Sequence, residues 1–153
     1  AEYCASLFIG CHEERFYLLC FDAKLQLTKE ILIGTGSMQA VQVLPRQVVR
    51  EAMRANAVSV VVTHNHPSGM PEPSQADADL TCGIRDALQM VEIKLVDHVV
   101  VGTQAVYSFQ RDHVLPLQTE ENAVYMAAED NRLLKRMGTE KNICREDEEL
   151  LWD

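Results

Sequence analysis

Short apolar runs near the N-terminus of the chain have the length and residue types of β-strands. One run covers residues 16–22 (Phe-Tyr-Leu-Leu-Cys-Phe-Asp), and a second covers residues 27–33. The intervening residues, 23–26, predict a turn, so we expect the two runs to pair as a hairpin. The hairpin would end at the Gly-Thr-Gly-Ser sequence of residues 34–37.

The apolar spacing then becomes helical, and helices and strands alternate through the middle of the chain. Pro45 can begin a helix without losing a hydrogen bond, and apolar residues recur at helical spacing to about Ala57. Residues 58–63 form a β-branched run that is typical of a central strand covered on both faces. Beyond a Pro- and Gly-rich loop at 67–73, we expect a helix over 74–90 and strands over 93–101 and 105–109.

This alternation predicts an α/β fold, in which a mixed sheet carries helices on both faces as a three-layer α/β/α sandwich. At 153 residues the chain is long enough for one domain with a buried core. We place that domain at residues 1–117. Residues 118–153 would form a C-terminal extension, with a weak helical pattern over 119–138 followed by a polar, acidic tail.

Composition and charge exclude several classes of function. The 14 basic and 23 acidic residues give a net charge of −9, which argues against the clustered Lys and Arg that nucleic-acid binding needs. No apolar run reaches the ~18 to 20 residues of a membrane span, and the N-terminus has no signal-peptide pattern. The chain begins without Met, as a fragment would. Five cysteines without a Cys-x-x-Cys pair are typical of reduced thiols, so we expect a cytoplasmic location.

Two histidines and an aspartate after the predicted central strand have the spacing of a metal site. His64 and His66 follow the strand, and at i and i+2 in an extended chain they point to the same side. Asp77 lies at the start of the next helix, on the face of its apolar residues. Open α/β sheets bind ligands at the carboxyl ends of their strands. Three such ligands can hold one Zn²⁺ and leave a position for water, as catalytic zinc sites do.

The same residues also have ordinary structural explanations. A single histidine in a loop is usually only a polar loop residue. Ser74-x-x-Asp77 is also a capping box, in which side chains satisfy the free N–H groups of a helix start. Capping and metal binding can hold together, because the cap would fix the position of Asp77.

A zinc-bound water needs a base, and Glu30 is our candidate. Glutamate is depleted in strands, yet Glu30 lies inside the second predicted strand. A solvating charge on an edge strand is the alternative for this residue. We interpret Glu13, Glu14 and Glu51 as turn or surface residues.

The metal-binding pattern resembles the signature of a known family. His64-x-His66-Pro67, followed by Ser74-x-x-Asp77, resembles the motif of the JAMM, or MPN-type, metalloproteases. The fuller run from Thr63 is similar to that of the RadC branch. Three further stretches share this similarity, which covers about residues 5–117: Glu30-x3-Gly34-Thr35, Pro45-Arg46 and Asp97-His98-Val-Val-Val-Gly102.

The resemblance implies a cytidine-deaminase-like α/β/α sandwich and zinc-dependent hydrolysis of a peptide or isopeptide bond. It implies His64, His66 and Asp77 as ligands of one Zn²⁺ per chain, Glu30 as the general acid/base, and Ser74 as a hydrogen-bond donor to the oxyanion. The chain departs from the pattern because it lacks the helix-hairpin-helix segment that often precedes the domain in RadC proteins. It also has Gln47 where many members have Glu.

Two other functions remain open from the sequence. The chain could be a non-catalytic scaffold of the same fold, although such scaffolds have lost the metal ligands that this chain keeps. It could also be a nucleic-acid-associated metal-binding module, in keeping with the family's historical label of DNA repair, but the negative charge argues against this. We therefore expect a protein or peptide substrate, whose identity the sequence does not reveal.

Overall fold

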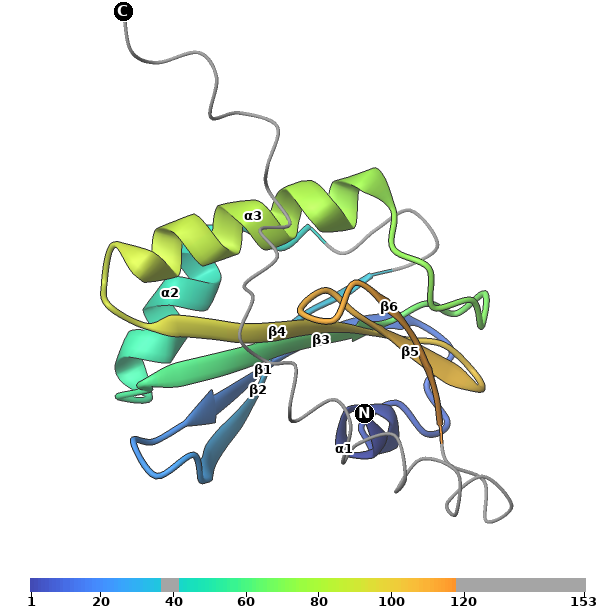
Figure 1. The fold of residues 1–153 in the computed structure, drawn as a ribbon, viewed down its shortest axis with the longest axis horizontal. Coiled ribbons are helices and arrows are strands. Elements are labelled where there is room, and N and C mark those ends of the chain that lie inside the picture. Colours follow the sequence, from blue (N-terminus) through green and yellow to red (C-terminus); the bar gives the residue numbers. More distant parts are fainter. Residues whose placement is uncertain (37–41, 118–153) are drawn as a thin grey trace, which may run out of the picture.

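The computed structural model describes residues 1–36 and 42–117 of the chain. Within these residues, six strands form one mixed sheet accompanied by three helices, which confirms the predicted mixed α/β fold (Figure 1). The elements in chain order are α1 (Glu2–Ser6), β1 (Glu14–Phe21), β2 (Leu27–Gly36), α2 (Pro45–Arg54), β3 (Ser59–Asn65), α3 (Gln75–Gln89), β4 (Lys94–Val101), β5 (Ala105–Ser108) and β6 (His113–Pro116).

The order of strands across the sheet is β2-β1-β3-β4-β5-β6. β3 and β4 pair in parallel, and α3 is the crossover between them. The other neighbouring pairs of this sheet are antiparallel. β3 is therefore central, and its β-branched run is buried, with Val60 and Val62 fully covered. This burial explains why β3 reads as a nearly continuous apolar segment.

One face of the sheet carries α2 and α3 (Figure 1). The core on this side joins side chains of β1 and β3, such as Leu18 and Val62, to Val48 of α2 and Ile84 of α3. α2 begins at Pro45, and the side chain of Gln47 accepts a hydrogen bond from the free N–H of Leu44 at 2.8 Å. The regularly spaced apolar residues that predict the two helices are thus the residues that α2 and α3 bury against the sheet.

The opposite face carries the short helix α1 (Figure 1). Cys4 and Phe8 pack there with Leu19 of β1 and Val99 and Val101 of β4. Neither α1 nor β6 was predicted from the sequence. Helix α1 has five residues, too few to show a helical period, and β6 has only four.

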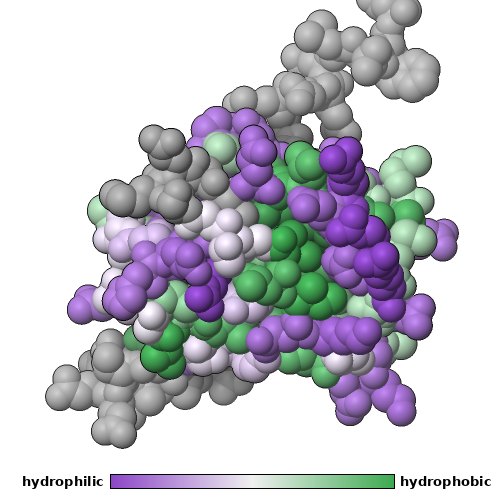
Figure 2. Space-filling view, turned by 180° about the vertical axis from the view of Figure 1, so that it is seen from behind, coloured by the Kyte–Doolittle hydropathy of each residue, from purple (hydrophilic) through white to green (hydrophobic). Residues whose placement is uncertain are grey.

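Figure 2 shows the side of the molecule turned away in Figure 1, where an apolar area is bordered by hydrophilic side chains. The exposed large apolar side chains include Leu27 and Leu32 on the edge strand β2 and Met53 on α2. In the described part of the chain, no helix is long and apolar enough to cross a membrane. The predicted helix at 119–138 and the tail at 139–153 lie outside the described residues.

The thiols agree only in part with the expectation of reduced cysteines. Cys4, Cys11 and Cys20 are free. Cys82 is disulfide-bonded, so the expectation is wrong for this residue.

Candidate metal centre

The site forms where β3 ends. His64 is the cross-strand partner of Phe16 on β1, and the two rings stack with their centroids 5.7 Å apart. Because side chains alternate along a strand, the buried valines before His64 fix the face on which it lies. Its side chain is 1% exposed, on the side of the sheet that α3 covers. The polar ring is therefore buried at the carboxyl end of a central strand.

The structure brings the three predicted metal ligands together. One ligand atom from each of His64, His66 and Asp77 lies within 4.8 Å of the others. Nε2 of His64 lies 3.1 Å from Nε2 of His66 and 3.2 Å from Oδ1 of Asp77. Nε2 of His66 lies 3.5 Å from Oδ2 of Asp77. Two imidazole nitrogens and a carboxylate converging in this way are a donor set that fits a metal ion.

Asp77 reaches the site from the first turn of α3. Its Oδ2 accepts hydrogen bonds from the backbone N–H and the hydroxyl of Ser74, both at 2.7 Å, and the N–H of Asp77 donates to the hydroxyl of Ser74 at 3.1 Å. The capping box thus fixes the position of Asp77, the predicted metal ligand. The predicted oxyanion role of Ser74 stays a prediction, since its hydroxyl proton is engaged with Asp77.

The charges of the site follow from these contacts. Burial by itself raises the pKa of Asp77, but hydrogen bonds from His64, His66 and Ser74 outweigh it and hold the pKa well below its usual range. The hydrogen bond with Asp77 also raises the pKa of His66, against the effect of burial. Asp77 is therefore a carboxylate at neutral pH, which is the form that binds a cation.

The loop after β3 sets the orientation of His66. Nδ1 of His66 lies 3.0 Å from the carbonyl oxygen of Met70 and donates its proton there, so Nε2 is the ring nitrogen that faces His64 and Asp77. Gly69 has φ +85°, and a Cβ at this position would lie 2.5 Å from Oγ1 of Thr103. The N–H of Thr103 also donates to the carbonyl of Gly69 at 2.9 Å. Only glycine fits this close approach, which anchors the loop against the end of β4.

Two residues beside the ligands were not identified as site residues from the sequence. His98 of β4 is fully buried, with Nε2 2.8 Å from Nδ1 of His64 and Nδ1 2.6 Å from Oγ1 of Thr81. Burial lowers the pKa of His98 well below its ordinary value, so it is neutral at pH 7. A histidine inside a run of valines was the available signal, but the parallel pairing of β3 with β4 is needed to place it.

The structure does not bring Glu30 to this site. Glu30 of β2 pairs with Leu19 of β1, and Leu19 belongs to the core on the α1 side of the sheet. Directly opposed residues project to the same face, so Glu30 lies on the α1 side too. Its carboxylate accepts a hydrogen bond from the hydroxyl of Tyr3 at 2.8 Å. The metal ligands lie on the other face, and assigning Glu30 as the base is therefore corrected.

Glu14, interpreted above as a turn or surface residue, lies closer to the metal ligands. It is the first residue of β1, two positions before Phe16, and so projects to the face of Phe16 and His64. β1 and β3 are antiparallel, so the residue two positions before Phe16 on β1 lies opposite the residue two positions after His64, which is His66. The negative charge of Glu14 contributes to the raised pKa of His66. This carboxylate is thus near the ligand set.

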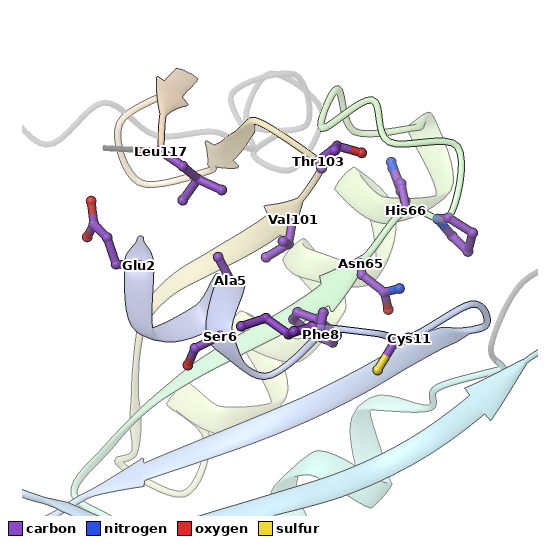
Figure 3. A pocket seen from close by; sticks show the side chains of 13 residues that line it. Glu2, Ala5, Ser6, Phe8, Cys11, Asn65, His66, Val101, Thr103 and Leu117 are labelled. Atoms are coloured by element: carbon purple, nitrogen blue, oxygen red, sulfur yellow. The ribbon is translucent and has the colours of Figure 1, made fainter. Parts of the chain in front are cut away.

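A pocket adjoins the metal ligands on the α1 side. Figure 3 shows it between α1 and the ends of β3 and β4, with His66 among its lining residues. Its volume is about 480 Å³. The lining is largely apolar and includes Ala5, Phe8, Ile9, Pro67, Val101 and Leu117. The amide of Asn65, also in the lining, is already hydrogen-bonded: it accepts from the N–H of Arg15 at 2.8 Å and donates to the carbonyl of Glu13 at 3.0 Å.

The family profile of the RadC-like JAB domain matches residues 1–115. The chain belongs to the RadC-like JAB domain family. It is 43% identical over 107 residues to a UPF0758 protein of Vibrio cholerae, which is 70% of this chain and 48% of that relative. It is 44% identical over 102 residues to a UPF0758 protein of Paraburkholderia xenovorans, which is 67% of this chain and 40% of that relative.

These RadC-like relatives are longer than the chain. A UPF0758 protein of Burkholderia cenocepacia is 43% identical over 111 residues, which cover 72% of the chain and 43% of the relative. The chain thus spans less than half the length of these relatives. Their names specify no activity, so what the RadC-like domain does has to be argued from its site.

Proposed function

We propose that this RadC-like JAB domain is a zinc-dependent hydrolase of the JAMM type that cleaves a peptide or isopeptide bond. The convergence of His64, His66 and Asp77 at the carboxyl end of β3 carries this proposal. Two histidines and one carboxylate form the ligand set of catalytic zinc sites that keep a position open. We also propose that the helices on the two faces of the sheet make this a three-layer, cytidine-deaminase-like fold.

The protein's own residues supply the rest of the chemistry. Zinc, when bound, lowers the pKa of a water ligand to about 7 and polarises the substrate carbonyl. Glu14 is the general base in this proposal, because its side chain lies on the ligand face beside His66. It accepts a proton from the attacking water and returns it to the leaving amine. Ser74 donates its hydroxyl proton to the developing oxyanion, in exchange for its bond to Asp77.

The pocket supports a peptide as the substrate. His66 belongs both to the ligand set and to the pocket lining, so the scissile bond and the pocket are adjacent. An apolar side chain that flanks the cleaved bond would lose contact with water among Phe8, Ile9 and Val101, which favours binding. We propose a protein or peptide partner of this kind and a cytoplasmic location. The net charge of −9 argues against a nucleic-acid partner and therefore does not support a role in DNA repair, the family's historical label.

A peptide library digested in ¹⁸O-labelled water tests this function. The zinc-loaded full chain should generate new C-termini that carry ¹⁸O, with apolar residues enriched beside the cleaved bond. Glu14→Gln should retain zinc and lose this activity, because Gln has a similar shape but cannot accept the proton. Absence of labelled products from a protein that holds zinc would contradict the proposed hydrolase.

A further inference from the structure

A chain of three hydrogen bonds, two of them buried, joins two of the predicted metal ligands through His98 and Thr81. Nδ1 of His64 lies 2.8 Å from Nε2 of His98, and Nδ1 of His98 lies 2.6 Å from Oγ1 of Thr81. The hydroxyl of Thr81 donates to the backbone carbonyl of Asp77 at 2.6 Å. His64, His98 and Thr81 are each buried. The chain therefore begins at one ligand and ends on the backbone of another.

The positions of the protons follow from the end of this chain. A backbone carbonyl can only accept a hydrogen bond, so the single proton of the Thr81 hydroxyl is directed at Asp77. The oxygen of Thr81 must then accept the proton on Nδ1 of His98. A neutral imidazole with its proton on Nδ1 has a lone pair on Nε2, and this lone pair accepts from Nδ1 of His64. Nδ1 of His64 is thus committed to donating, and Nε2, the atom that faces His66 and Asp77, is the nitrogen that can bind a metal in place of a proton shared with Asp77.

We propose that Thr81 and His98 are positioning residues that fix the tautomer of His64, so that Nε2 is its metal-binding atom. This inference rests on the proposed metal site and extends it by naming what prepares the ligand. If each hydrogen bond of this series were donated in the opposite direction, the ring proton of His64 would lie on Nε2 and block the metal. The hydroxyl of Thr81 decides the direction, although it touches neither the metal position nor the ring of His64.

The packing around His98 holds its ring in the position that the hydrogen-bond chain requires. The ring of Phe109 stacks on His98 with centroids 5.0 Å apart, and the ring of Phe16 meets it edge-on at 5.6 Å. The N–H of Phe109 also donates to the carbonyl of His98 at 3.0 Å. His98 is the register partner of Val62 in the parallel pair of β3 and β4, which places it beside His64. The imidazole of His98 is thus confined between two aromatic rings.

Thr81 offers a matched pair of substitutions that separate its hydroxyl from its shape. Thr81→Val keeps the branched side chain and removes the hydroxyl, so that nothing fixes which way the hydrogen bonds between His98 and His64 are donated. Thr81→Ser keeps the hydroxyl and removes only a methyl group. The proposal predicts that Val but not Ser allows Nδ1 of His64 to lose its proton. Zinc affinity should then fall on the order of tenfold in Thr81→Val, as is usual when such an outer partner of a metal ligand is lost.

Two measurements on the full-length chain test the inference. Nitrogen NMR of the metal-free protein with ¹⁵N-labelled histidine reports the tautomer directly, and His64→Asn identifies the signals of His64. We expect the proton on Nδ1 in the wild type and in Thr81→Ser, and a mixture of both tautomers in Thr81→Val. Competition with a chelator then gives the zinc affinity of each variant, and circular dichroism confirms that each is folded.

The outcomes distinguish this inference from the proposed function. A wild-type His64 that carries its proton on Nε2 and none on Nδ1 would overturn the inference without any variant having to fold. An unchanged tautomer and unchanged zinc affinity in folded Thr81→Val would overturn it as well. If the expected tautomers are found and the zinc-loaded protein cleaves no peptide, the inference is supported and the proposed hydrolase fails alone.

Discussion

Ser74 and Asp77 are hydrogen-bonded to each other in both directions across the first turn of α3. The carboxylate of Asp77 accepts from the N–H and the hydroxyl of Ser74, and the N–H of Asp77 donates back to that hydroxyl. The hydrogen bonds that cap α3 therefore also fix the position of Asp77, a predicted metal ligand. The start of α3 holds one oxygen of Asp77, while the other lies 3.2 Å from Nε2 of His64.

Ser74→Ala should affect both stability and metal binding. Removal of a capping hydroxyl lowers the free energy of unfolding by about 1 kcal/mol. It also frees the carboxylate of Asp77 to rotate, so zinc affinity should fall together with stability. Urea unfolding and chelator competition measure the two effects. Ser68→Ala, at an exposed position of the neighbouring loop, removes only a long 3.4 Å hydrogen bond from the N–H of Met70; it is the matched control and should change neither by a comparable amount.

The protein should bind about one zinc ion per chain. Elemental analysis after purification without added metal gives the stoichiometry. His64→Ala, His66→Ala and Asp77→Ala should each lower the zinc content, because each removes one of three converging ligands. A zinc content near zero in the wild type that added zinc does not restore would contradict the proposed metal centre.

Glu14→Gln and Glu30→Gln should have opposite consequences. The Glu14 substitution removes the proposed base on the ligand face and should abolish hydrolysis with zinc still bound. Glu30 lies on the other face with Tyr3, so its substitution should leave hydrolysis within a few-fold of the wild type. Rates on one peptide from the library, measured at equal zinc content, give the comparison. Loss of activity only in Glu30→Gln would restore the assignment made from the sequence.

Residues 118–153 should be dispensable for metal binding. They contain no histidine, and residues 119–153 carry 5 basic and 10 acidic residues. The ligands and the hydrogen-bonded residues around them all precede residue 118. A chain ending at Leu117 should remain soluble and bind zinc with the stoichiometry of the full chain. Unfolding of this shorter chain would show that the extension packs on the domain and that the predicted boundary is wrong.

Local spacing was enough to predict that His64, His66 and Asp77 lie together. His64 and His66 are two residues apart in an extended segment, and Asp77 lies in the first turn of the next helix, so no distant pairing is needed to group them. The β-branched run of β3 and the apolar faces of α2 and α3 were predictable for the same reason. Each of these signals lies within one element and its immediate connection.

Glu30 was wrongly assigned as the base because the face of the sheet on which its side chain lies depends on strand register. Glu30 was chosen for being unusual in a strand, but its side of the sheet follows from its pairing with Leu19. Glu14 could be placed only by pairing Phe16 with His64 across two strands. His98 likewise needs the parallel register of β3 with β4. The pairings of β1 with β3 and of β3 with β4 join segments far apart in the chain, which the apolar pattern of a single sequence does not encode.

The position of His64 on β3, with His66 directly after its last residue, has a consequence for the metal-free protein. β3 is held by strands on both sides, and its core consists of packed side chains rather than coordinated metal. Folding and metal uptake are then separate events, unlike those of small domains that fold only around zinc. Treatment with a chelator should yield an intact and inactive protein that zinc restores. The availability of zinc in the cell would set how much of an already folded population can work.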